Sequence, residues 1–198
     1  MIIGICGLIG AGKDTAADYL VNWHEFKRDS FAATLKDAVS AVFGWDRELL
    51  EGRTKAAREW RERIDTWWAS RLDMPDLTPR WVLQYWGTDV FRNHFHQDIW
   101  IASLENKLRQ TRDNVVISDC RFLNEVESIR SIGGRVIRIV RGQDPEWFHL
   151  ARTNPHNMPL QYPGVHASEY SWAPTDFDHI VENNGTIDEL YSELKNLV

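Results

Sequence analysis

The sequence lacks the features that mark several special classes of protein. It has only two cysteines, Cys6 and Cys120, in 198 residues, which excludes a disulfide-rich secreted domain. We expect both thiols to be buried and chemically inert. No apolar run approaches the roughly 20 residues that cross a bilayer, and the first residues show neither a basic leader nor a long apolar stretch. We therefore expect a cytoplasmic protein without a membrane partner.

Positive charge is also scarce. The chain has 23 Lys and Arg residues against 29 Asp and Glu, a formal net charge of −6, which argues against a surface built for a nucleic-acid polymer. The sequence contains no internal repeat and no low-complexity tract. Hydrophobic residues make up 43% of the chain and charged residues 26%, a composition typical of a globular domain with one core.

Short apolar runs alternate with helical patterns along the chain. The apolar runs predict strands at residues 2–6, 115–118, 135–140 and 179–182. The helical patterns predict helices at residues 13–23, 32–43, 53–71, 79–85 or beyond, 97–110, 123–132 and 187–197. Such alternation predicts an α/β fold of three layers, with a central parallel sheet flanked by helices. Five of the seven prolines fall within residues 144–175, so this stretch is expected to be a functional lid or a disordered insertion.

The strongest motif follows the first predicted strand. Residues 7–13 read Gly-Leu-Ile-Gly-Ala-Gly-Lys, the G-x-x-x-x-G-K pattern of a phosphate-binding loop. Its glycines let backbone N–H groups converge on phosphate oxygens, the following helix adds its dipole, and Lys13 adds a point charge. A turn that only joins strand to helix is the plain alternative. The apolar strand before the loop and the alanine-rich helix after it favour nucleotide binding.

Two oxygen-bearing residues follow Lys13. Asp14 occupies the position at which a serine or threonine ordinarily ligates magnesium, and Thr15 comes next. A carboxylate can also hold magnesium, directly or through water. The sequence therefore predicts a magnesium ion at these two residues and leaves open which of them is the ligand.

A second candidate cluster, Asp119 and Arg121, follows the predicted strand at 115–118. That strand delivers Asp119 to the carboxyl edge of the sheet, where open α/β sheets bind their ligands. Asp119 could orient magnesium or accept a proton from an acceptor, and Arg121 could clamp a phosphate. A cap for the helix at 123 explains Asp119 equally well by itself. The phosphate loop makes the catalytic interpretation the favoured one.

Several cations elsewhere are weaker candidates. Arg80 and Gln84 share one helix face beside aromatic rings, which suits an anion and a planar base. Without other information, a solvated arginine above core tryptophans explains that pattern better. Lys36 could reach a phosphate, although a single lysine on a helix is ordinarily solvated. Three arginines flank the start of the proline-rich stretch, as lid arginines do in phosphoryl transfer: Arg138, Arg141 and Arg152.

These motifs together resemble the bacteriophage deoxynucleoside-monophosphate kinases. The matching pieces occur in the family's order along nearly the whole chain: Gly12-Lys13-Asp14-Thr15-Ala16-Ala17-Asp18, Leu35-Lys36-Asp37-Ala38, Arg80-x3-Gln84-x2-Gly87-Thr88-Asp89, Trp100, Asp119-x-Arg121 with Glu125, Val140-Arg141-Gly142, His166-x-Ser168-Glu169, and residues 183–190. The resemblance implies a single P-loop kinase domain over residues 1–198. Within it, a helical region for the nucleoside monophosphate is expected at about 31–112 and a lid at about 141–175.

The resemblance also implies an activity, magnesium-dependent transfer of the γ-phosphoryl group of ATP to a deoxynucleoside monophosphate. It assigns catalytic roles to Lys13, Asp119 and Arg121, with magnesium at Asp14 or Thr15. The residues it assigns to ATP are Gly7, Gly10, Ala11, Gly12, Lys13, Asp14, Thr15 and Arg141. The residues it assigns to the acceptor are Lys36, Arg80, Gln84, Gly87, Thr88, Trp100, Asp119, Arg121 and Glu125.

Two other functions stay open from the sequence. Kinases of the dephospho-coenzyme A or phosphomevalonate type also carry an N-terminal phosphate loop, and a nucleotide-binding scaffold would have the loop without turnover. Residues 144–163 are long and proline-rich for the resembled lid. Residues 48–76 carry no matching motif, and we expect base choice to be decided there. The sequence does not define the oligomeric state, although the resembled family makes a homodimer an expectation.

Overall fold

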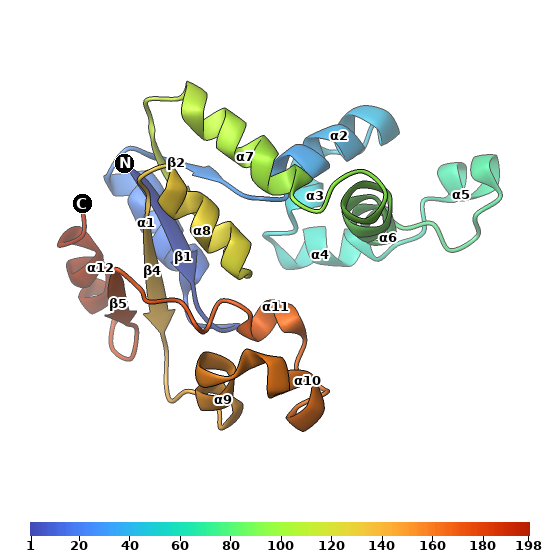
Figure 1. The fold of residues 1–198 in the computed structure, drawn as a ribbon. Coiled ribbons are helices and arrows are strands. Elements are labelled where there is room, and N and C mark those ends of the chain that lie inside the picture. Colours follow the sequence, from blue (N-terminus) through green and yellow to red (C-terminus); the bar gives the residue numbers. More distant parts are fainter. The chain divides into compact units, whose positions relative to one another are not determined.

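The computed structural model describes residues 1–198. Contacts along the chain divide it into two compact units (Figure 1). The first, here called the sheet unit, comprises Met1–Phe31 and Glu105–Val198; the second, the helical unit, is Ala32–Leu104. None of the helices combines the length and the apolar character needed to cross a membrane.

Five parallel strands form the centre of the sheet unit, in the order β2-β3-β1-β4-β5. The strands are β1 (Ile2–Cys6), β2 (Phe26–Asp29), β3 (Asn114–Ile117), β4 (Arg135–Val140) and β5 (His179–Glu182). Strand β1 pairs with β3 on one side and with β4 on the other. Because the chain continues to both sides of β1, the carboxyl end of this strand is a topological switch point, where open α/β sheets bind ligands.

Helices cover both faces of this sheet. They are α1 (Lys13–Trp23), α8 (Leu123–Ser131) and α12 (Ile187–Lys195), followed around residues 147–170 by α9 (Trp147–Thr153), the 3₁₀ turn η2 (Pro155–Asn157), α10 (Met158–Gln161) and α11 (Ala167–Tyr170). Successive strand residues point to opposite faces. Ile5 of β1 packs in one core with Leu20 of α1 and Leu190 of α12, whereas Gly4 faces Ile129 of α8. The sheet therefore lies between two helical layers (Figure 1).

The helical unit has its own aromatic core. Its elements are α2 (Ala33–Phe43), α3 (Arg47–Glu51), α4 (Lys55–Arg61), α5 (Thr66–Leu72), α6 (Pro79–Gln84) and the π-helical segment η1 (Tyr85–Asn93), and α7 (Ile99–Gln110) begins there and ends in the sheet unit. Phe43 stacks on Trp45 with ring centroids 4.4 Å apart, and Trp68 meets Phe43 edge-on at 4.9 Å. Apolar side chains from α2, α3, α6 and α7 complete this core: Leu35, Val39, Leu50, Val82 and Trp100.

Most of the predicted elements are confirmed. All four predicted strands are present, within one residue of their expected ends. The predicted helix at 79–85 begins at Pro79 as α6, and the Thr78 hydroxyl caps it by accepting the N–H of Trp81 at 3.1 Å. Gly133, at φ +78°, follows α8, and Thr186 caps α12. Both cysteines are buried and free, and burial together with the neighbouring Cys6 thiol raises the pKa of the Cys120 thiol well above its usual range.

One predicted helix is wrong, and several elements were not predicted: β2, α3 and the short helices α9, η2, α10 and α11 within residues 144–175. The single helix expected over residues 53–71 is two helices, α4 and α5. Asp65 separates them because its carboxylate accepts the N–H groups of Trp67 and Trp68 at 3.1 Å each, which starts a new helix. The same carboxylate accepts Trp45 Nε1–H at 2.7 Å. Strand β2 has only one fully buried residue, Phe26, and α3 has five residues, so neither produced a periodic pattern.

Candidate active site

The phosphate loop joins β1 to α1 in a conformation that requires glycine. Gly7 has φ +149° and Gly12 has φ +102°, and a Cβ on Gly7 would come 2.5 Å from the Ile139 carbonyl oxygen. A Cβ on Gly12 would overlap the Asn183 amide, which itself donates to the Ala11 carbonyl at 2.8 Å. The loop is therefore held from β4 and from the turn after β5 as well as by its own residues.

Lys13 is the first residue of α1, and its side chain folds back over the loop. Its Nζ donates to the carbonyl oxygens of Gly7 and Leu8, each at 2.9 Å. Burial lowers the pKa of Lys13, and the positive charge of Arg121 lowers it further, although Asp14 and Glu169 act in the opposite direction. Two cations thus lie near each other at a partly buried loop. An anion with several oxygens, bound there, would offset the repulsion between them.

The turn after β3 holds Arg121 in this position. The buried carboxylate of Glu125 accepts the backbone N–H of Arg121 at 2.8 Å and that of Phe122 at 3.2 Å. Glu125 therefore supports the turn that starts α8. The Arg121 side chain is about half exposed, and its Nη1 lies 4.0 Å from Glu169 Oε1 on α11. A pair at this distance is weak, so the Arg121 guanidinium can exchange Glu169 for a phosphate.

Arg28 on β2 is a residue that the sequence did not indicate. Its guanidinium pairs with the Asp14 carboxylate, lies 2.8 Å from Asp18 Oδ1, and donates to Ser118 Oγ at 2.7 Å. Only 14% of the Arg28 side chain is exposed. Arg28 thus fastens the first two turns of α1 to the ends of β2 and β3. The signal that could have revealed it is the pair of carboxylates four residues apart on α1, but its partner lies on an unpredicted strand.

The oxygen donors at this site fit a magnesium ion that arrives with a triphosphate. Asp14, Thr15 and Asp119 offer carboxylate and hydroxyl oxygens, which magnesium prefers, and it commonly takes one or two carboxylates plus phosphate oxygens. The molecule contains no cluster of three or more His, Cys, Asp or Glu residues that could hold a metal ion. The Asp14 carboxylate is bound to Arg28, which favours the Thr15 hydroxyl or water-mediated contact from Asp14.

Of the three arginines flanking the proline-rich stretch, two are exposed and one is buried. Arg141 is exposed just beyond β4, where the N–H of Gly142 donates to Asn184 Oδ1 at 2.6 Å. Arg152, near the end of α9, is exposed as well. Arg138 is only 5% exposed and pairs with Asp144. Arg138 therefore holds the start of this stretch rather than extending from it.

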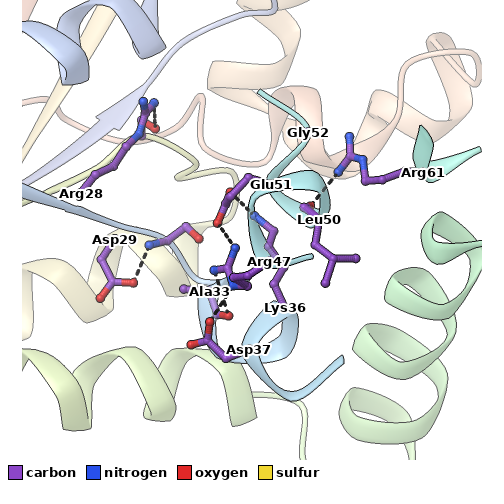
Figure 2. A network of polar contacts seen from close by, with 12 residues as sticks. Arg28, Asp29, Ala33, Lys36, Asp37, Arg47, Leu50, Glu51, Gly52 and Arg61 are labelled. Carbon is purple, nitrogen blue, oxygen red and sulfur yellow. Dashed lines mark hydrogen bonds and ion pairs between the residues drawn. The ribbon is translucent and has the colours of Figure 1, made fainter. Parts of the chain in front are cut away.

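Two of the predicted acceptor residues of the helical unit, Lys36 and Arg80, form ion pairs, and Lys36 belongs to a polar network between α2 and α3 (Figure 2). Lys36 Nζ lies 2.7 Å from Glu51 Oε2, and Arg47 Nη1 lies 2.6 Å from Glu51 Oε1. Arg80 Nη1 lies 3.2 Å from Glu62 Oε1. Lys36 is thus a half-buried, paired lysine rather than a solvated one.

The other predicted acceptor residues differ in exposure. Gln84 and Thr88 are exposed. Trp100 is buried, and its Nε1–H donates to the Gly87 carbonyl at 2.9 Å. A Cβ on Gly87 would come 2.9 Å from Leu35 Cδ2. Gly87 and Trp100 are therefore part of the packing of this unit. Their roles toward a nucleotide stay predictions.

The contacts of Arg28 lead to a stability prediction. We expect Arg28→Met to lower the free energy of unfolding by about 1–2 kcal/mol, because three charge-assisted contacts are lost but two of the partners are exposed. The matched control is Lys27→Met on the same strand, whose pair with Asp113 is exposed on both sides and should contribute much less to stability. Urea unfolding measures both, and equal losses in the two variants would contradict an anchoring role for Arg28.

Comparisons with known proteins give a consistent result. A family model described as deoxynucleotide monophosphate kinase matches residues 64–194. A protein of Acanthamoeba polyphaga mimivirus, assigned as a deoxynucleotide monophosphate kinase, is 30% identical over 208 residues, covering 98% of this chain and 94% of that one. The deoxynucleoside-5'-monophosphate kinase of Escherichia phage T5 is 27% identical over 66% of this chain and 72% of its own. A solved shikimate kinase from Aquifex aeolicus aligns over 100% of this chain and 95% of that chain, at 14% identity and a TM-score of 0.48.

Proposed function

The chain belongs to the deoxynucleotide monophosphate kinase family, and from this premise we propose that it transfers the γ-phosphoryl group of ATP to a deoxynucleoside monophosphate, with ADP and a deoxynucleoside diphosphate as products. The observation that carries this proposal is a glycine loop that holds Lys13 at the switch point of a parallel sheet, with Arg121 on the turn after the neighbouring strand β3. Such a site favours a polyphosphate over a neutral ligand.

In this proposal the phosphate loop binds the donor. Backbone N–H groups of residues 7–13 and the N-terminus of α1 face the β- and γ-phosphates, and Lys13 Nζ leaves its two carbonyl partners to contact their oxygens. Magnesium, when bound, neutralises charge on the β- and γ-oxygens. Thr15 and Asp119 would hold it, with Asp14 fixed beside them by Arg28.

The acceptor phosphate supplies its own nucleophile. An oxygen of the monophosphate bonds to the γ-phosphorus as the bond to the β–γ bridging oxygen breaks, and ADP leaves with that electron pair. A phosphate monoester with a second pKa of about 6 is mainly a dianion at pH 7, so no base is needed to deprotonate it. This chemistry favours the metal-orienting role of Asp119 over proton acceptance. Arg121 then offsets the charge of the acceptor phosphate.

A panel of acceptors tests the proposal. Purified protein is incubated with ATP, magnesium and each deoxy- or ribonucleoside monophosphate in turn, and diphosphate products are separated by chromatography. We expect at least one deoxynucleotide to be converted with one ADP formed per product. The Lys13→Met variant run in parallel controls for host kinases. Failure of every deoxynucleotide to accept the phosphoryl group would overturn the proposal.

A further inference from the structure

Arg61, the last residue of α4, lies beside three ion-paired cations but has no carboxylate partner of its own. Lys36 and Arg47 each pair with Glu51, and Arg80 pairs with Glu62. The only hydrogen bond of Arg61 runs from Nη1 to the Leu50 carbonyl oxygen at 3.4 Å (Figure 2). Its Nε is buried and has no hydrogen-bond partner. Buried donors of this kind are nearly always satisfied in folded proteins.

The backbone at Gly52 leaves room for this guanidinium. Gly52 is buried at the end of α3 with φ +68°, and a Cβ there would overlap Cζ and Nη2 of Arg61 and lie 2.8 Å from its Nε. The guanidinium therefore packs against the turn between α3 and α4. Its Nη groups have no carboxylate partner, and a guanidinium presents such donors in the fork geometry that matches phosphate oxygens.

The charges around Arg61 do not neutralise it. Burial lowers the pKa of Arg61, and the positive charge of Arg80 lowers it further, whereas Glu62 and Glu51 raise it. Glu51 is already shared by two other cations. Burial by itself would raise the pKa of Glu51, but hydrogen bonds and charge from Lys36 and Arg47 bring it below its usual value. Arg61 and Arg80 thus form a like-charged pair with one exposed carboxylate, Glu62, between them.

We propose that Arg61 binds the acceptor's phosphate together with Arg80, so that the α3–α4 turn forms part of the acceptor site. This inference rests on the proposed function for the identity of the acceptor. A phosphate dianion would accept from the Nη groups of Arg61 and replace Glu62 at Arg80, whose exposed pair is easily exchanged. It gives the segment at residues 48–76 a role in holding the acceptor's phosphate, whatever the base.

The test compares Arg61→Gln with Arg58→Gln. Arg58 lies on the same helix and donates to the Gly52 and Arg53 carbonyls at 3.2 and 2.9 Å, so it braces the same turn without a buried unsatisfied donor. We expect Arg61→Gln to raise the KM for the deoxynucleotide about 10–100-fold, as loss of a charged phosphate contact does, and to change the KM for ATP less than about twofold. Arg58→Gln should change neither KM. An equal rise in the KM for the deoxynucleotide in both variants would mean that Arg61 only stabilises the turn, which contradicts the proposal. An unchanged KM in Arg61→Gln would overturn it as well.

A second variant and a second measurement keep the outcomes distinct. Arg61→Lys keeps the charge but loses the planar fork, so we expect a smaller rise in the KM for the deoxynucleotide, and it answers the question if Arg61→Gln does not fold. Deoxynucleotide binding without ATP, followed by tryptophan fluorescence, needs no turnover. If the wild type binds deoxynucleotide tenfold more tightly than Arg61→Gln but shows no transfer, the proposed function fails and this inference stands. If transfer occurs and Arg61→Gln binds deoxynucleotide as tightly as the wild type, the proposed function stands and this inference fails.

Discussion

Replacing Lys13 with methionine is expected to lower kcat by about 10²–10³-fold, the loss that follows removal of one preorganised donor from developing charge. The ammonium group is held at the loop by the Gly7 and Leu8 carbonyls, so it needs only a short movement to contact phosphate oxygens. Phosphoryl transfer depends almost entirely on positioning and charge neutralisation. Loss of this one charge should therefore affect turnover more than any other single change in the loop.

Stability distinguishes this effect from misfolding. Burial and Arg121 lower the pKa of Lys13, which means that the folded protein disfavours the charged form relative to the unfolded chain. A neutral side chain of similar length removes that cost. We expect the Tm of Lys13→Met to stay close to that of the wild type while turnover falls, as measured by thermal unfolding and by single-turnover transfer of labelled phosphate.

Arg121→Gln provides the matched comparison at the same site. Its guanidinium is about half exposed and its pair with Glu169 is long, so its loss should weaken use of the acceptor more than ATP binding. Direct titration with ATP in the presence of magnesium measures ATP binding for both variants. Equal defects in ATP binding for Lys13→Met and Arg121→Gln would contradict the separate roles given to these cations.

The phosphate loop was predictable because its chemistry is local. Seven consecutive residues define it, and the strand before it and the helix after it have strong patterns of their own. The position of Asp119 and Arg121 followed from one further step, since parallel strands bring their carboxyl ends to the same edge. The pairing of β1 with β3 confirms that step. The roles of these residues toward nucleotides stay predictions.

The contacts that could not be predicted join residues far apart in the sequence. Arg28 reaches Asp14, Asp18 and Ser118 from an edge strand whose only buried apolar residue is Phe26. A hydrophobic pattern cannot reveal a strand that buries one side chain. Recognising Arg28 also required the pairing of β2 with β3. That pairing depends on the whole sheet and cannot be read from the residues of β2.

Arg61 was hidden for a different reason. Residues 53–71 are rich in arginine and tryptophan, which supports one long amphipathic helix when only spacing is considered. The break depends on Asp65, whose carboxylate caps α5 and also accepts from Trp45, 20 residues earlier. Only with that break does α4 end at Arg61. The unsatisfied Nε then depends on packing against Gly52, a close approach that no periodicity encodes.

The stretch with five prolines is attached to the sheet by a buried cation. Arg138 on β4 pairs with Asp144, lies 4.0 Å from the Phe148 ring centroid and 5.4 Å from that of Trp172. Arg138 is 5% exposed, and Trp172 is 1% exposed. The two aromatic residues come from opposite ends of the stretch. One guanidinium therefore organises α9 and the segment after α11 against the end of β4.

Asp144→Ala is expected to lower the free energy of unfolding by about 2–4 kcal/mol, because it leaves a buried guanidinium without its counter-ion. This loss is somewhat smaller than the roughly 3–5 kcal/mol expected when a fully buried ion pair is broken, because the Asp144 side chain is 33% exposed. The cost comes from the unpaired charge rather than from the lost contact. Arg138→Met combined with Asp144→Ala should therefore recover most of the stability, since a methionine packs well against the Phe148 and Trp172 rings.

Urea unfolding of the single and double variants measures the loss of stability and its recovery. Limited proteolysis near residue 144 reports whether the proline-rich stretch has become more mobile. Recovery in the double variant would show that the charge of Arg138 is what Asp144 is needed for. A double variant no more stable than Asp144→Ala would mean that the cation–aromatic contacts themselves stabilise this part of the chain. An Asp144→Ala protein as stable as the wild type would contradict the anchoring role altogether, because an uncompensated buried cation always destabilises the fold that holds it.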